Sequence, residues 1–144
     1  MHLQPETGFR ESYRIKGETL ITVQDYTSGK LFDDAVSYAF YPVDLHTKSG
    51  VRPKPLKRGI VPSIPLGALI PKGSRNLIVA GRCLSSDRLA NSGLRVQASC
   101  MGMGQAAAAA ATLAAQENTT PLEVPLAKIH GLLKKHGAII PGKA

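Results

Sequence analysis

Two glycines, Gly102 and Gly104, lie near the start of a helix predicted over residues 98–115, which include six consecutive alanines. Alanine is the best helix former and is depleted in sheets, so this stretch is predicted to be helical. Glycine in the first turns leaves backbone N–H groups uncovered, and those groups carry the positive end of the helix dipole. Each glycine costs about 1 kcal/mol relative to alanine in a helix interior, so we expect something nearby to need the space. A flat or anionic ligand would use it, and tight helix packing alone is the alternative.

The cysteines, Cys83 and Cys100, are further side chains with reactive groups. They lack C-x-x-C spacing and a neighbouring histidine cluster, so no metal site is predicted. Cys100 lies near the predicted helix start, which can lower the pKa of a thiol, although a small buried hydrophobic side chain is the favoured interpretation. Two cysteines do not make a disulfide framework, and we expect a reduced, cytoplasmic protein.

A strand and a polar loop precede the alanine helix and would position any chemistry at its start. Residues 76–81 are apolar after Asn76 and end in Gly81, a pattern typical of a short, fully buried strand. Nearly every position of the helix itself is small, so its axis could approach a sheet or a flat ligand closely. The helix is not predicted to span a membrane, because polar residues interrupt it and it lacks large apolar side chains.

The other segments predict a mixture of short elements. A strand is expected around residues 13–15, and residues 32–40 are ambiguous between helix and strand. Residues 47–59 predict an exposed basic loop, and the prolines in residues 61–70 favour an extended segment that is not a central strand. Apolar positions at helical spacing predict a short basic helix over residues 125–136.

Composition and charge narrow the possible classes of protein. The 144 residues suit one modest domain, and 43% hydrophobic with 19% charged residues indicates a globular chain. The formal net charge of +8 suggests an anionic partner, which leaves a basic anion-binding module as a minor alternative. Nucleic acid is not the favoured partner, since the chain has no tryptophan, zinc-finger spacing or RNA-binding aromatic motif. The amino terminus lacks the basic and apolar regions of a signal peptide.

Several motifs in order resemble the carboxy-terminal flavin-binding segment of the FAD-dependent oxidoreductases, a family related to the fumarate-reductase-like flavoproteins. Three of them are N-L-I-V-A-G-R-C-L-S from Asn76, A-N-S-G-L-R-V from Ala90 and C-M-G-M-G-Q-A-A from Cys100. Upstream, Y-P-V-D-L-H from Tyr41 and I-P-L-G-A-L-I-P from Ile64 agree as well. The resemblance therefore covers most of the chain.

The resemblance implies two groups of residues that bind the FAD cofactor. One is a turn beside the flavin ribityl chain, and the other is a helix start whose backbone donors face the flavin pyrimidine oxygens. The turn comprises Gly81, Arg82 and Cys83, and the helix start comprises Gly104, Gln105 and Ala106.

Two catalytic residues are also implied, Arg95 and His46. Arg95 matches a loop arginine near the isoalloxazine and the substrate, where a guanidinium could hold a carboxylate bidentately or stabilise charge on a reduced flavin. A structural or surface salt bridge is the alternative. His46, in Asp44-Leu-His46, matches a D-x-H position near the cap domain, and a hydrogen-bonded structural histidine is its alternative. The implied reaction moves hydride between a small-molecule substrate and the flavin.

The unit that would hold the FAD pyrophosphate is not found in the sequence. It needs a strand, a G-x-G-x-x-G turn and a helix, and no such unit precedes residue 76. Residues 102–107 fit G-x-G-x-x-A, but without a clear βαβ unit around them. The predicted fold class is therefore α/β, a partial Rossmann-like FAD-binding domain with the end of a mixed α+β substrate domain.

Three parts are predicted along the chain. Residues 1–70 form the end of a substrate or cap domain, residues 71–116 the last strand and helix of the FAD-binding domain, and residues 117–144 a helical tail. The missing amino-terminal half would be the partner that completes the FAD site, and we do not expect catalysis from this chain alone. The main alternative is a non-catalytic fragment or packing module that lacks the nucleotide-binding half.

Overall fold

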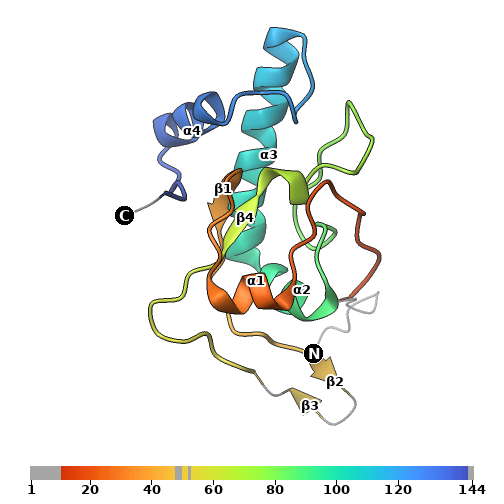
Figure 1. Cartoon of the computed structure of the whole chain (residues 1–144), viewed down its shortest axis with the longest axis vertical. Helices are drawn as coiled ribbons and strands as arrows, with labels where there is room; N and C mark the ends of the chain where they lie inside the picture. Colours follow the sequence, from red (N-terminus) through yellow and green to blue (C-terminus); the bar gives the residue numbers. More distant parts are fainter. Residues whose placement is uncertain (1–10, 48–49, 52, 143–144) are drawn as a thin grey trace, which may run out of the picture.

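The structure, a computed structural model, describes residues 11–47, 50–51 and 53–142 (Figure 1). Short helices and strands make up the first two thirds of the chain, and the 21-residue helix α3 dominates the rest. The elements are α1 (Val23–Ser28), β1 (Ala35–Tyr38), β2 (His46–Thr47), β3 (Gly50–Val51), β4 (Ser63–Pro65), the 3-10 helix η1 (Leu66–Ala68), α2 (Arg88–Leu94), α3 (Gln97–Glu117) and α4 (Leu126–Lys135). The chain thus mixes helices with small sheets, which agrees with the predicted α/β class at this level.

The strands form two separate antiparallel pairs. β1 pairs with β4, with Ser37 opposite Ile64, and β2 pairs with β3, with His46 opposite Val51. The ambiguous residues 32–40 therefore contain a strand. β4 is paired on one side, as its proline-rich segment predicted.

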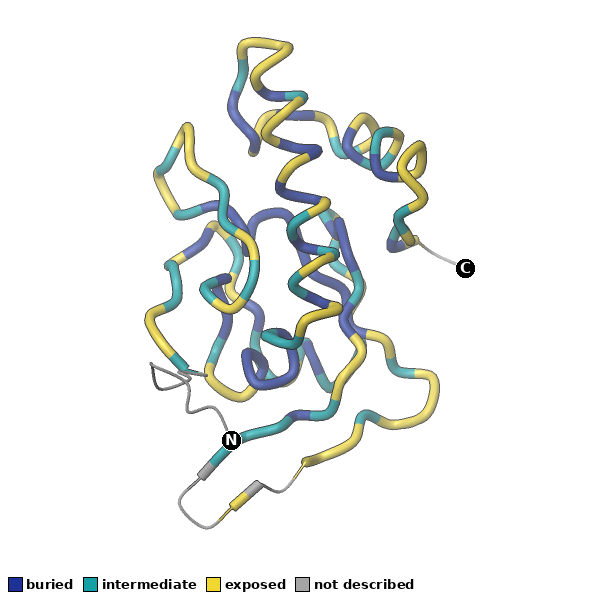
Figure 2. Tube along the Cα trace, turned by 180° about the vertical axis from the view of Figure 1, so that it is seen from behind, coloured by how far each residue is buried: buried dark blue, intermediate teal, exposed yellow. Residues whose placement is uncertain are grey.

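Helix α3 confirms the helix predicted over residues 98–115 and extends it at both ends. It packs against β1 and α4, and its buried face carries alanines together with Met103. Figure 2 shows buried and exposed positions alternating along it. A Cβ atom added at Gly102 would collide with the Ser37 hydroxyl of β1, so this glycine has a packing role within the chain.

The segment after α3 also follows the sequence prediction. Asn118 adopts a left-handed conformation with φ 52°, which ends the helix. α4 then lies within the range predicted for the basic helix, and it buries Ile129 and Leu133. The described residues share one hydrophobic cluster, to which all three predicted parts contribute side chains such as Val36, Met103 and Ile129. The three-part division stays a prediction.

The buried strand predicted over residues 76–81 is wrong. The structure assigns no strand there, and Leu77 is 52% exposed. The Val79 N–H donates to the Leu69 carbonyl at 2.8 Å, but among the described residues no backbone hydrogen bond involves Leu77 or Ile78. An apolar run becomes a buried strand only when neighbouring strands and helices cover it, and the described part of this chain supplies no strand beside it. The segment instead belongs to a loop that projects from the body of the molecule (Figure 1).

The strand expected around residues 13–15 is also wrong. Tyr13 is 96% exposed, and the Ile15 N–H donates to the Cys83 carbonyl at 2.8 Å without a continuing ladder. The nearest bridge is isolated and joins Gly17 to Pro71. In the described ranges, no helix has both the length and the apolarity to cross a membrane.

Candidate functional site

A cleft of about 440 Å³ brings together segments that lie far apart in the sequence. It includes His46, Arg82 and Arg95, so the fold groups both predicted catalytic residues with one predicted cofactor-binding residue. The lining consists of Tyr41, Asp44, His46, Arg82, Ser92, Arg95 and Val96, and we call it the Arg95 cleft.

The corner between α2 and α3 positions the arginine of this cleft. α2 begins after Asp87, whose carboxylate accepts hydrogen bonds from the Ala90 N–H at 2.8 Å and the Val23 N–H at 2.6 Å. The helix ends at Leu94, Arg95 is its C-cap residue, and Val96 is the residue before α3. The first amides of α3 precede its first helical hydrogen bond, so the positive end of the helix dipole faces the same corner.

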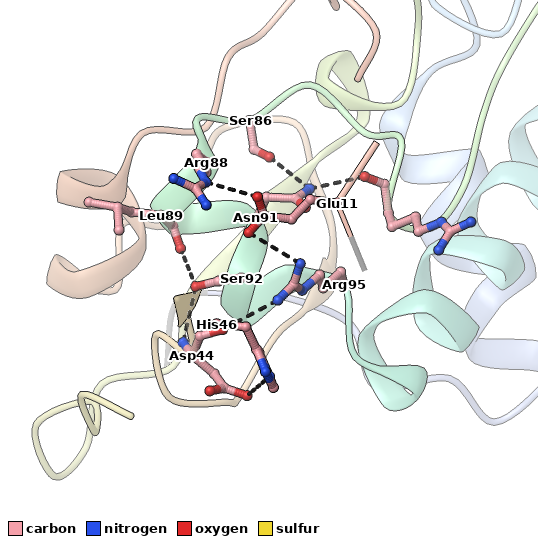
Figure 3. Close-up of polar contacts among 10 residues, drawn as sticks. Glu11, Asp44, His46, Ser86, Arg88, Leu89, Asn91, Ser92 and Arg95 are labelled. Carbon is pink, nitrogen blue, oxygen red and sulfur yellow. Dashed lines mark hydrogen bonds and ion pairs between the residues drawn. The ribbon is translucent and has the colours of Figure 1, made fainter. Parts of the chain in front are cut away.

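Arg95 is largely buried, and its guanidinium lies between two segments (Figure 3). Its side chain is 9% exposed, with Nη1 3.6 Å from Glu11 Oε1 and Nη2 3.4 Å from the Asp44 carbonyl oxygen. The structural salt bridge considered for this residue is therefore present. Because a guanidinium carries five N–H donors, the ion pair and a position on the cleft wall are compatible.

Asp44 accompanies His46 in the cleft, a neighbour to which sequence reasoning gave no role. His46 Nε2 lies 3.5 Å from Asp44 Oδ2, and the Asp44 N–H donates to Ser92 Oγ at 3.0 Å (Figure 3). Asp44 Oδ1 is buried and has no hydrogen-bond partner in the described structure. The Asp44 carboxylate therefore faces the His46 imidazole at ion-pair distance. The D-x-H spacing was the available signal, because alternate residues of an extended segment point to the same side.

Gly81, Arg82 and Cys83 form a tight turn that leads from the projecting loop to α2. Gly81 has φ 95°, a conformation that favours glycine, and the Leu84 N–H donates to its carbonyl at 3.1 Å. Arg82 is exposed at the cleft, and its own carbonyl accepts from Asn91 Nδ2 at 3.0 Å. A Cβ atom at Gly81 would lie 3.8 Å from Cys100 Sγ, so this turn packs against the first turns of α3.

Gly104, Gln105 and Ala106 do not form a helix start, so that part of the prediction is wrong. α3 begins at Gln97, and seven residues later the backbone amides are already in i to i−4 hydrogen bonds. The three side-chain positions also face different ways. Gly104 faces open space one turn beyond Cys100, Gln105 lines a groove beside α4, and Ala106 is buried in the core.

The two cysteines are half-buried, and neither is the fully buried hydrophobic side chain favoured for Cys100. Burial raises the pKa of the Cys100 thiol, the nearby Cys83 thiol acts in the same direction, and Arg82 opposes both. Across the described ranges, no group of three or more His, Cys, Asp or Glu side chains could hold a metal ion.

A family model described as FAD dependent oxidoreductase matches residues 1–133. The chain belongs to the FAD dependent oxidoreductase family. No curated protein and no solved structure matches it. Members of such a family bind FAD in general, so the residues of this chain can be compared with what each end of FAD requires.

The described residues suit the ring end of FAD better than its pyrophosphate end. A Cβ atom at Gly104 would meet no atom of the described residues within 4 Å, so a planar ring could approach the backbone there, on the side of α3 that faces the Gly81 turn. A pyrophosphate instead needs free amides at a glycine turn. Residues 102–107, the one G-x-G-x-x-A match noted in the sequence, lie inside α3, where the amides are already bonded.

Proposed function

We propose that this chain is the carboxy-terminal segment of an FAD-dependent oxidoreductase, related to the fumarate-reductase-like group. It would contact the flavin ring and ribityl chain and supply part of the substrate pocket. The observation that carries the proposal is the Arg95 cleft, where His46, Arg82 and Arg95 meet at the positive end of α3. Membership in the FAD dependent oxidoreductase family supports it.

On the substrate side, the cleft suits a small anion. Arg82 is exposed at the cleft and Arg95 lies in its wall, so a carboxylate would meet two cations. His46 lines the same cleft with Nε2 3.5 Å from Asp44 Oδ2, so its imidazole would be the group that exchanges a proton with a substrate. Asp44 is a positioning residue in this proposal, and flavin, when bound, supplies the acceptor or donor of hydride.

On the cofactor side, the Gly81 turn and the open position at Gly104 would hold the flavin. They lie on one side of α3, linked through Cys100 one helical turn before Gly104. Gln105 and Ala106 would affect the flavin site only by holding the helix backbone in place, since their side chains lie toward α4 and the core. In this arrangement residues 71–116 belong to a Rossmann-like FAD-binding domain, residues 1–70 to the substrate domain, and residues 117–144 to a tail.

A second polypeptide segment, carrying the nucleotide-binding half, would complete the FAD site. Two exposed features of the described chain support this partner. The Leu77–Ile78 backbone has no hydrogen-bond partner within the described residues, and it would become a strand only beside another strand. The exposed side of α3 carries Met101, which is 73% exposed, and alanines at positions 108, 111 and 115, beside the polar Gln105 and Thr112.

The same exposed features favour one alternative, a non-catalytic module that packs against another protein without flavin. Visible absorption of the chain, purified together with a polypeptide that carries a G-x-G-x-x-G unit, separates the two. A flavin band in the complex supports the oxidoreductase, and a stable but colourless complex supports the packing module.

The cleft itself is tested by titrating the full chain with succinate, a small dicarboxylate, and following backbone amide resonances by NMR. We expect saturable shifts at Arg82, Arg95 and His46. Arg82→Gln should weaken binding about fivefold, because an exposed ion pair contributes about 1 kcal/mol. Arg58→Gln removes the same charge from the exposed basic loop and should leave binding unchanged. Equal losses in both variants would mean that succinate responds to net charge alone.

A further inference from the structure

We propose that Cys83 and Cys100 form a reversible dithiol–disulfide pair beside the Arg95 cleft. Cys83 follows Arg82 in the Gly81 turn, and Cys100 lies in the first turn of α3. The pair is a redox modification site, and it does not depend on the proposed role in flavin binding.

One contact of each sulfur places it beside Ala80 or Gly81, at the start of the turn. A Cβ atom at Gly81 would lie 3.8 Å from Cys100 Sγ, so that sulfur lies against the start of the turn. Cys83 Sγ is turned back toward the same residues, 3.7 Å from the Ala80 carbonyl oxygen. The turn is closed by the Leu84 N–H to Gly81 carbonyl bond at 3.1 Å, which keeps Gly81 and Cys83 close together.

Electrostatics gives a second sign that the thiols are close. Burial is the largest cause that raises the pKa of Cys100, and the charge that Cys83 would carry as a thiolate raises it further. Arg82, between Gly81 and Cys83, lowers it. This contribution is consistent with the two thiols lying close to each other.

Access and flexibility suit reversible chemistry. Both cysteines are half-buried, so a small oxidant can reach them. A disulfide needs Cα atoms within about 7 Å. Cys83 lies in an irregular turn rather than in a helix or strand, so the turn can adjust while α3 stays fixed.

The oxidant in the proposed reaction is a small disulfide, such as glutathione disulfide. The Cys83 thiolate attacks one of its sulfurs, which forms a Cys83–glutathione bond and releases one glutathione thiol. The Cys100 thiolate then attacks Cys83 Sγ, which forms the Cys83–Cys100 bond and releases the second. Two protein thiols lose two electrons and two protons, and one disulfide is reduced to two thiols. Cys83 reacts first because burial keeps Cys100 protonated to higher pH.

Peptide mapping tests the pair directly. The full chain is incubated with glutathione disulfide, quenched in acid, alkylated and digested with trypsin, which cleaves after Arg82, Arg88, Arg95 and Lys128. We expect peptide 83–88 to be joined to peptide 96–128, in a yield that does not change with protein concentration. Cys83→Ser and Cys100→Ser should each stop at the mixed disulfide with glutathione.

A parallel reaction in urea shows whether disulfide formation depends on the folded structure or only on the short separation of the two cysteines in the sequence. The ratio of joined peptide to glutathione adduct should fall about tenfold on unfolding, because the folded chain holds the two thiols near each other. Separate adducts on each cysteine, unreacted thiols, bonds formed only between molecules, or an unchanged ratio in urea would each overturn the proposal. Circular dichroism of both serine variants checks that they fold.

Discussion

At the scale of single residues, the cleft depends on Tyr26, which does not line it. The Tyr26 ring is fully buried, and its hydroxyl donates to the carbonyl oxygen of Tyr41, a cleft residue, at 2.8 Å. The same ring packs on Gly93 of α2, where a Cβ atom would lie 2.6 Å from the hydroxyl oxygen. Tyr26 therefore joins α1 to both walls of the cleft, and neither contact could be read from the sequence.

The Gly93 contact predicts whether an alanine at this position stabilises or destabilises the fold. Alanine normally stabilises a helix relative to glycine, but Gly93→Ala should lower the free energy of unfolding by about 1–3 kcal/mol, because the rigid, buried Tyr26 ring must move. Gly131→Ala in α4, where a Cβ atom would meet nothing within 4 Å in the part of the chain that the structure describes, should raise it by up to about 1 kcal/mol. Urea unfolding of both variants measures the difference. Stabilisation by both would show that Tyr26 does not hold Gly93.

The same burial predicts a pH dependence. Burial raises the pKa of Tyr26 from 10.0 to about 12, although the hydrogen bond to Tyr41 acts in the opposite direction. The folded chain therefore keeps the phenol proton after the unfolded chain has lost it. The stability contribution is complete below pH 10 and is lost as the pH rises toward 12. Urea unfolding across this range should show a steeper alkaline loss for the wild type than for Tyr26→Phe. Parallel curves would contradict the assignment.

At the scale of elements, the sequence could predict those helices and strands whose formation depends on residues close to one another in the chain. α3 and α4 were predictable because alanine content and apolar spacing act within a helix. The strand over residues 76–81 was not, since a strand needs neighbours that the described chain does not provide. α1, a six-residue helix with a capping box from Thr22 to Asp25, was missed as well.

The site shows the same division. Sequence motifs selected His46, Arg82 and Arg95, and the fold places them around one cleft. Motifs could not show that Glu11 pairs with Arg95, because the two residues are far apart in the sequence. The motifs also predicted a helix start at Gly104, whereas α3 begins seven residues earlier, at Gln97.

An alanine at Gly104 in α3 should affect stability and flavin binding in opposite directions. Gly104→Ala should raise the unfolding free energy of the isolated chain by about 0.5–1 kcal/mol, because no atom of the described residues occupies the space beside it. The same methyl group should weaken flavin binding in the completed protein, since the proposed ring lies there. Stability is measured by urea unfolding and flavin content by visible absorption. A destabilised chain, or unchanged flavin content, would show that Gly104 has a different role.

At the scale of the whole molecule, the chain has a core but leaves Leu77 and Met101 exposed at its surface. Leu77→Ala should change the unfolding free energy by less than about 1 kcal/mol, because this side chain is half exposed. Leu69→Ala, at a fully buried position nearby in the fold, should lower it by about 2–5 kcal/mol. Thermal or urea unfolding of the pair measures this. Equal losses would mean that residues 76–81 are buried after all.

The most direct test of the central claim is an NMR titration of the full chain with FMN, with inorganic phosphate at the same concentrations as the control. The account predicts saturable amide shifts at residues 81–83 and around Gly104 that phosphate does not reproduce. FAD should bind no more than about threefold more tightly, because the described residues offer no pyrophosphate site. Shifts confined to the basic loop, shifts reproduced by phosphate, or no shifts at these two positions would contradict a flavin site on this chain.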